Sequence, residues 1–200
     1  MTSPPTKLRL VVGLTGASGA VYGIRLLQRL RELPVETHLI VSRWGRVTIE
    51  HETDYSIADV RELADVVHSD SDLAAPVSSG SFLTRGMVIV PCSTKTLAGI
   101  TTGFADTLIC RAADVMLKER RRLVLVVRET PLSAVHLRNM ATLSELGATV
   151  FPPTPAFYPR PRSLDDVVDY TVLRILDQLD LGEESPWRWT GLSGSTPAEA

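Results

Sequence analysis

Hydrophobic residues are distributed along the chain in two alternating patterns. Short continuous apolar runs are typical of strands covered on both faces of a parallel sheet, and apolar residues three or four positions apart are typical of one helix face. The predicted strands are residues 7–14, 35–41, 86–91 and 123–127, with a last short one at Val150–Phe151. The predicted helices run from Val21 to near Pro34 and over residues 43–52, 95–101, 108–120, 133–146 and 163–179. Strands that alternate with helices predict an α/β fold with one doubly wound parallel sheet.

The remaining segments complete the predicted organisation. Residues 57–67 mix both patterns and fit neither, and Pro152–Pro161 forms a proline-rich loop before the last helix. We expect residues 1–6 to be a disordered tail and residues 7–182 to be the folded domain. Residues 183–200 are predicted to be a polar tail that is loosely held, apart from Trp187 and Trp189.

Length, composition and charge narrow the class of protein. At 200 residues the chain is long enough for one domain that buries a sizeable core without disulfides. A formal net charge of −2 gives no general attraction to nucleic acid or to an anionic membrane. Two cysteines are too few for a disulfide framework, no apolar run approaches the roughly 18 residues of a membrane helix, and no secretory signal pattern is present. We therefore expect a cytoplasmic protein.

Four segments that follow predicted strands carry the candidate chemistry. They are Gly16–Gly19, Ser42–Arg43, Cys92–Thr96 and Arg128–Thr130. In a parallel sheet such segments meet at the carboxyl edge, where ligands bind near the point at which the strand order reverses. Their small residues, hydroxyl groups and cations suit a phosphate and a polar ribityl-like chain, because backbone N–H groups at helix starts favour anions.

The glycine spacing favours a mononucleotide over a dinucleotide. Gly13, Gly16 and Gly19 follow the pattern G-x-x-G-x-x-G rather than G-x-G-x-x-G, and the lysine of a Walker A loop is missing. The second strand is followed by Ser42 rather than by the acid that usually binds the ribose of NAD, although Arg43 leaves NADP open. The alternative for the glycines is an ordinary tight turn between strand and helix.

The segment Cys92–Thr96 combines three hydroxyl groups and a lysine at a predicted helix start. These groups suit a phosphate or the edge of a flavin. The alternative is that Ser93 or Thr94 is a simple helix N-cap and that Lys95 extends into solvent.

No metal site is predicted. Asp165, Asp166 and Asp169 spell D-D-x-x-D, a magnesium-diphosphate signature, but they open a predicted helix and no second aspartate cluster completes the site. Ser163 is a natural N-cap for that helix, and acids in a first turn are favoured by the helix dipole. The four histidines are scattered without the spacing of metal ligands.

An ordered set of motifs resembles one known family. The motifs are LTGASGAVYG from Leu14, SSGSF from Ser78, PCSTKTLAGI from Pro91, RAADV from Arg111, LKERR from Leu117, RETPL from Arg128 and PAFY from Pro155. Together they closely resemble the UbiX/Pad1 family of flavin prenyltransferases, whose members have also been called aromatic acid decarboxylases. The resemblance runs from about Lys7 to Leu179 and returns near Trp189–Gly191.

The resemblance implies a fold and an activity. The fold would be a flavodoxin-like, Rossmann-like subunit that binds FMN. The activity would join a dimethylallyl group from dimethylallyl phosphate to N5 and C6 of reduced FMN, and the prenylated FMN would serve a UbiD-type decarboxylase. The resemblance also implies a large homo-oligomer with sites at subunit boundaries.

The motifs also imply roles for individual residues. Ser18 and Glu52 would handle protons. Tyr158 and Arg174 would bind the phosphate of the prenyl donor; the alternative for Arg174 is a surface ion pair with Asp177 or Asp180. The residues that would contact FMN are Gly16, Ala17, Ser18, Ser42, Ser93, Thr94, Lys95, Thr96 and Arg128.

Two other functions compete with this interpretation. The first is an FMN-dependent decarboxylase of the cysteine-decarboxylating family, which carries a P-x-M-N-x-x-M-W segment that this sequence lacks. The second is a flavin carrier without chemistry. A carrier has no need for a second phosphate pocket, so the presence of Glu52, Tyr158 and Arg174 argues against it.

Overall fold

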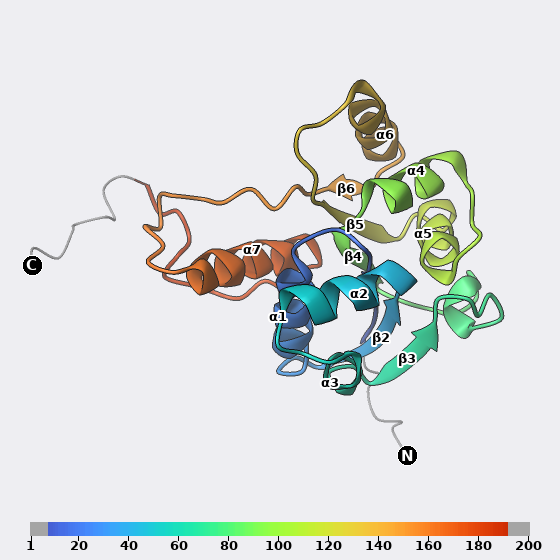
Figure 1. The fold of residues 1–200 in the computed structure, drawn as a ribbon, viewed down its shortest axis with the longest axis horizontal. Helices are drawn as coiled ribbons and strands as arrows, with labels where there is room; N and C mark the ends of the chain where they lie inside the picture. The colour runs from blue at the N-terminus through green and yellow to red at the C-terminus, as the bar shows by residue number, and fades with distance from the viewer. Residues whose placement is uncertain (1–7, 192–200) are drawn as a thin grey trace, which may run out of the picture.

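Residues 8–191, which the computed structural model describes, form an all-parallel sheet with helices on both faces (Figure 1). The strands are β1 (Leu8–Leu14), β2 (Val35–Val41), β3 (Val66–Ser69), β4 (Gly86–Cys92), β5 (Arg122–Val127) and β6 (Thr149–Val150). Their order in the sheet is β3-β2-β1-β4-β5-β6. The order reverses between β1 and β4, which is the doubly wound arrangement and marks the usual ligand crevice. The predicted fold class is confirmed.

The helices form two layers, and one helix crosses the carboxyl edge of the sheet. They are α1 (Ala20–Leu30), α2 (Arg43–Glu52), α3 (Ile57–Glu62), α4 (Thr94–Thr102), α5 (Leu108–Lys118), α6 (Ala134–Glu145) and α7 (Leu164–Gln178). Helices α1 and α7 pack together on one face, and α4, α5 and α6 cover the other (Figure 1). Helix α2 starts beside the end of β1, where the Ser42 amide donates to the Leu14 carbonyl oxygen at 2.9 Å.

The sheet divides the hydrophobic core into two halves. Leu10, Val12 and Leu14 of β1 are buried in the half that contains the residues of α1 and α7. Val11 is buried in the other half, with the residues of α5. Successive side chains of a strand point to opposite faces, so a strand covered on both sides is apolar at every position. This double burial explains the continuous apolar runs of the sequence.

The proline in β4 does not end the strand. The strand predicted to stop at Pro91 continues to Cys92, and its pairing with β5 shifts register between Ile89 and Cys92. Pro91 lies in this irregular stretch, where the regular pairing of the strands is interrupted and does not require an N–H group from it. The Pro91 carbonyl accepts hydrogen bonds from the amide and the hydroxyl of Thr15, at 3.2 and 2.8 Å, and so ties the loop after β1 to β4.

The structure also resolves the segments that the sequence pattern left open. Residues 57–67 contain α3 and the start of the edge strand β3, and a reciprocal capping box between Ser56 and Asp59 starts α3. The predicted loose tail is held in part, because Glu183 pairs with Arg29 at 2.6 Å and Arg188 pairs with a carboxylate of α7. Residues 1–6 and the end of the predicted tail, residues 192–200, lie outside the described residues. Within residues 8–191, no helix has the length and apolar character needed to cross a membrane.

Two histidines lie side by side on the neighbouring strands β2 and β3. His38 of β2 is buried, and its Nδ1 atom lies 3.0 Å from Nε2 of the half-buried His68 on β3, with the two rings stacked. Burial lowers the pKa of His68, and the neighbouring His38 lowers it further. The folded protein therefore resists protonation of His68.

We expect His68 to destabilise the protein on acidification. Below about 6.5, the ordinary pKa of histidine, the unfolded chain protonates His68 more readily than the folded chain does, so the free energy of unfolding falls as the pH falls. The substitution His68→Asn should reduce this dependence in the acidic range. Urea unfolding of parent and variant at a series of pH values measures it. An identical pH dependence in the two proteins would exclude a contribution from His68.

Candidate active site at the carboxyl edge of the sheet

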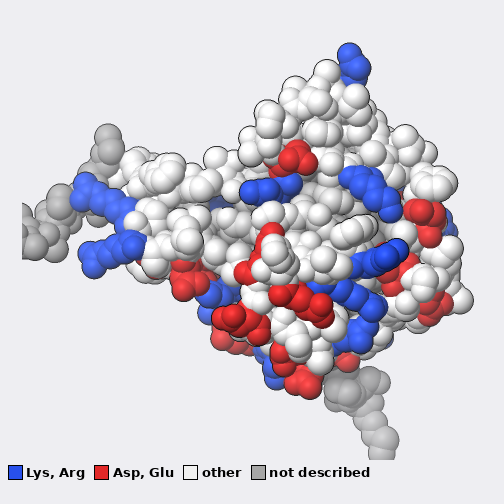
Figure 2. All heavy atoms as spheres, viewed as in Figure 1, with Lys and Arg blue, Asp and Glu red and all other residues white. Residues whose placement is uncertain are grey.

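A cavity of about 720 Å³ opens at the carboxyl edge, between the segments that follow β1, β2 and β4. Its lining includes Gly16, Ser42 and Ser93–Thr96. Figure 2 shows this face hollowed between α2 and the side of α4, with Lys and Arg side chains near the hollow. The structure thus brings residues of three of the four predicted segments together around one space, at the point where the strand order reverses, whereas Arg128–Thr130 does not line it.

Two helices begin at this cavity. The hydroxyl of Ser42 caps α2 by accepting from the Gly45 amide at 3.0 Å, and the hydroxyl of Ser93 caps α4 by accepting from the Thr96 amide at 3.3 Å. The alternative prediction, that Ser93 is the N-cap of this helix, is therefore confirmed. Neither first turn contains an acid, and each contains a cation, Arg43 or Lys95. Cations oppose the dipole at a helix start, so this arrangement favours an anionic ligand between the two helices.

The glycine turn lets α2 pack closely against the loop after β1. A Cβ atom on Gly16 would lie 2.4 Å from the Cβ atom of Trp44, and Gly19 has a φ of 102°. The tight-turn alternative is thus also correct, because these positions require glycine. The neighbouring Ala17 has a buried side chain, so only its backbone can face a ligand.

Glu52, at the end of α2, closes the N-terminus of α1. Its carboxylate accepts from the amides of Gly19 and Ala20 at 2.7 and 3.2 Å, where α1 has no side-chain cap of its own. Burial raises the pKa of Glu52, but hydrogen bonds from the Ser18 hydroxyl and these amides, together with the charge of Arg128, outweigh burial and lower the pKa overall. The structure therefore places Ser18 and Arg128 near the carboxylate of Glu52, and the lowered pKa keeps that carboxylate ionised at neutral pH.

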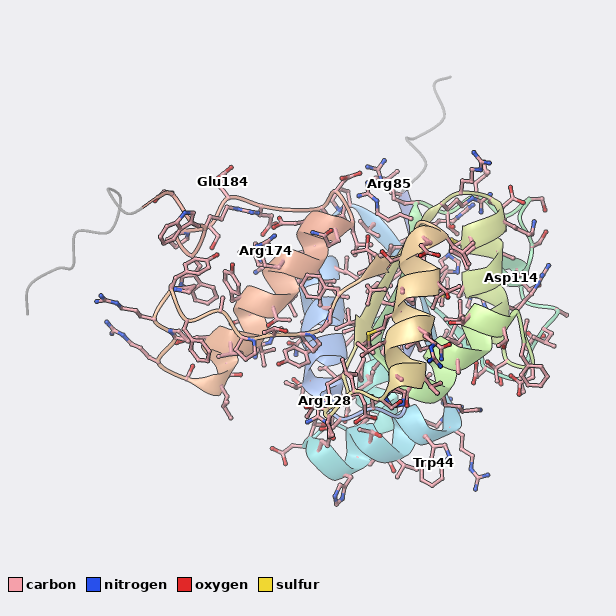
Figure 3. The ribbon with its side chains drawn as sticks, turned by 90° about the horizontal axis from the view of Figure 1, so that it is seen from above. Trp44, Arg85, Asp114, Arg128, Arg174 and Glu184 are labelled. Atoms are coloured by element: carbon pink, nitrogen blue, oxygen red, sulfur yellow. The ribbon has the colours of Figure 1, made fainter. Side chains whose placement is uncertain are left out.

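The two predicted donor-binding residues are linked through Tyr170, outside the lining of the carboxyl-edge cavity. The hydroxyl of Tyr158 hydrogen-bonds to that of Tyr170, and hydrogen bonding to Tyr170 raises the pKa of Arg174. Arg174 also donates from Nε to Asp177 at 3.0 Å, so the predicted alternative of an ion pair is observed. Neither Tyr158 nor Arg174 lines the carboxyl-edge cavity, and Figure 3 shows Arg174 on α7, well apart from Arg128.

The aspartate signature at the start of α7 has structural partners. The hydroxyl of Ser163 accepts from the Asp166 amide at 3.1 Å, and the Asp166 carboxylate accepts from the Ser163 amide, which completes a capping box. Arg25 of α1 pairs with both Asp165 and Asp169. The predicted N-cap is confirmed. In the part of the chain that the structure describes, no group of three or more His, Cys, Asp or Glu side chains is arranged to hold a metal ion.

Sequence reasoning missed several residues around these groups. Trp44 and Phe104 line the carboxyl-edge cavity, and Tyr170 links Tyr158 to Arg174. Trp44 directly follows the Ser42–Arg43 segment, so its position next to a predicted strand end was a usable signal. Phe104 lies in a loop and had no comparable signal.

Comparisons with known proteins show the family. The family model described as Flavoprotein matches residues 2–176. A relative from Streptomyces sp. (strain D7), named "Probable UbiX-like flavin prenyltransferase", is 60% identical over 192 residues, which is 96% of this chain and 96% of that protein.

Two solved structures extend the comparison. The crystal structure of AnUbiX (PadA1) in complex with FMN and dimethylallyl pyrophosphate is 57% identical, with a TM-score of 0.90, over 93% of this chain and 99% of that one. The dodecameric FMN-dependent Ubix-like decarboxylase from Escherichia coli O157:H7 is 56% identical, with a TM-score of 0.90, over 92% and 100%. The chain therefore belongs to the flavoprotein family, within its group of UbiX-like flavin prenyltransferases.

Proposed function

We propose that this chain transfers the dimethylallyl group of dimethylallyl phosphate to reduced FMN. The bond between the allylic carbon and the phosphate oxygen breaks, and carbon bonds form to N5 and C6 of the flavin. N5 and C6 each give up a proton. The alkene of the prenyl group takes up one of these two protons, and the departing phosphate takes the other. One observation carries the proposal: a protein with 57% identity and the same fold holds FMN together with dimethylallyl pyrophosphate. The carboxyl-edge cavity of this chain is lined by hydroxyl groups and cations that suit the phosphate and the ribityl chain of FMN.

The FMN half of the site fits the cavity between α2 and α4. Ser42, Lys95 and the backbone at the start of α4 would hold the phosphate and the ribityl chain, because two helix N-termini favour an anion there. Gly16 and Ala17 would contribute backbone groups. Reduced FMN, once bound, supplies the nucleophilic N5 and C6 atoms, and Arg128 would pair with the polar edge of its ring.

The donor half needs positive charge, because phosphate is a poor leaving group. Arg174 and the hydroxyl of Tyr158 would hold the phosphate and stabilise the charge that develops as it leaves. Within one chain these groups lie at α7 and the loop before it, apart from the FMN cavity (Figure 3). The related protein from E. coli O157:H7 is dodecameric. We therefore expect a homo-oligomer in which the donor-binding residues of one subunit approach the FMN cavity of another.

Ser18 and Glu52 would handle the protons. The lowered pKa of Glu52 makes it a proton acceptor at neutral pH rather than a donor, and the hydroxyl of Ser18 is the group through which it would act. The prenylated FMN would then pass to a UbiD-type decarboxylase. We expect both steps to take place in the cytoplasm.

A direct experiment separates this function from its competitors. The protein is incubated without oxygen with FMN, a reductant and dimethylallyl phosphate, and in parallel with FMN and a peptide ending in cysteine. Prenyl transfer predicts a flavin heavier by one five-carbon prenyl unit in the first reaction and an unchanged peptide in the second. A flavin of unchanged mass would reject the proposal, and decarboxylation of the peptide would favour the decarboxylase.

We expect the substitution Arg128→Ala to weaken FMN binding. Loss of a charge-assisted hydrogen bond costs about 1.5–3 kcal/mol, which is roughly a 10- to 100-fold increase in Kd. Arg138→Ala, at an exposed position of α6, is the matched control and should bind FMN like the parent. Isothermal titration with FMN measures both. An unchanged Kd for the Arg128 variant would remove Arg128 from the site.

A further inference from the structure

The wall of the carboxyl-edge cavity contains two exposed aromatic side chains that the proposed function does not use. Trp44 of α2 is 62% exposed and Phe104, in the loop between α4 and α5, is 63% exposed, yet both line the cavity. Single exposed apolar residues are ordinary on protein surfaces. Two large rings that border one cavity, beside polar groups suited to a phosphate, indicate a ligand with a flat apolar part.

The base of the Trp44 side chain is packed against the loop that follows β1. Its Cβ atom lies against Gly16, where any Cβ would come within 2.4 Å, so the loop after β1 and the first turn of α2 hold the base of the side chain. Figure 3 shows the ring projecting from α2 at the rim of the molecule. The indole is therefore anchored at its base and free along its face, which is the arrangement of a stacking surface.

The spacing along α2 relates Trp44 to the proton-handling group. Trp44 lies in the first turn of α2 and Glu52 at its last residue, eight positions later, which corresponds to about 12 Å along the helix. A flavin whose reacting edge faces Ser18 and Glu52 would extend back along α2 toward Trp44. From this geometry, and resting on the proposed function, we infer that the indole of Trp44 packs against the isoalloxazine of bound FMN and sets its position.

The inference predicts a specific set of binding results. Trp44→Ala should raise the Kd for FMN about tenfold, because stacking of a heteroaromatic ring on an aromatic side chain contributes on that scale. Trp44→Phe keeps an apolar ring and should bind FMN nearly as tightly as the parent. An indole in contact with an excited flavin quenches its emission by electron transfer and a phenyl ring does not, so FMN bound to Trp44→Phe should fluoresce more brightly.

Titration of oxidised FMN, followed by flavin fluorescence and calorimetry, tests these results without any turnover. Val47→Ala is the matched control, because Val47 is exposed on the same helix and is not among the residues lining the cavity. Parental affinity in Trp44→Ala, or parental emission in Trp44→Phe, would overturn the inference. Light scattering completes the test: a Trp44→Ala protein that binds FMN normally but loses its oligomeric state would place Trp44 in a contact between subunits instead. A parent that binds no FMN would reject the proposed function itself.

Discussion

Replacing Glu52 by glutamine should slow prenyl transfer by about a hundredfold or more, which is the usual contribution of a positioned acid or base. The amide oxygen of glutamine can still accept from the amides of Gly19 and Ala20, so the cap on α1 is retained. What disappears is the negative charge that takes up a proton through Ser18. The rate of formation of prenylated FMN, measured in single turnovers with saturating substrates, gives the effect.

Two further variants separate chemistry from folding at this position. Glu52→Ala removes both the charge and the cap, so it should lower the thermal midpoint as well as the rate. Glu50→Gln changes an exposed carboxylate on the same helix and should alter neither. If Glu52→Gln turned over at the parental rate, Glu52 would be a structural cap alone.

The second large effect is expected at Arg174. Arg174→Ala should lower the rate of prenyl transfer by about 10²–10³-fold, because it removes a charge that stabilises the departing phosphate. FMN affinity should not change, since Arg174 is assigned to the phosphate of the prenyl donor and not to FMN. Tyr158→Phe removes one hydrogen bond and should be the milder of the two. Kinetics with dimethylallyl phosphate as the varied substrate, alongside FMN titration, distinguish the two halves of the site.

Arg174 also belongs to an ion-pair cluster, so the test must separate a loss of catalysis from a loss of stability. Asp177 accepts from Arg174 and is also held by Arg188, through bonds of 3.0 and 2.7 Å. A surface ion pair of this kind contributes under about 1 kcal/mol. A variant with ordinary kinetics and slightly reduced stability would therefore assign Arg174 to the ion pair. Arg29→Ala, which also removes an arginine with carboxylate partners, is the control for general effects of lost charge.

The parts of the fold that follow from local pattern were predictable. Val35–Val41 and Arg43–Glu52 have the predicted bounds, because a buried strand leaves a short run rich in apolar residues and a capped amphipathic helix leaves a helical period. The edge strand β3 left none, since it is short and half exposed. Pro91 misled the prediction because the break in pairing that accommodates it depends on β5.

The site was predictable only in part, for a related reason. Segments that follow parallel strands must meet at one edge, so the order of elements is enough to predict that Gly16, Ser42 and Ser93 lie together, and they line one cavity. The bond between Glu52 and Gly19 spans 33 residues, and no spacing rule anticipates it. The pair of Arg174 with Asp177 has helical i,i+3 spacing and could be foreseen, whereas the link through Tyr170 depends on how the proline-rich loop folds back.

The most direct test of the central claim combines two measurements on one reaction. Protein, reduced FMN and dimethylallyl phosphate are mixed without oxygen and in excess EDTA, and the flavin mass and the released inorganic phosphate are followed together. The account predicts one prenylated FMN for each phosphate released, at a rate that EDTA does not change. The reason is that Arg174 and Tyr158 stabilise the leaving group, and not a metal ion held by the aspartates at the start of α7. A flavin of unchanged mass, or phosphate release that stops on chelation, would contradict it.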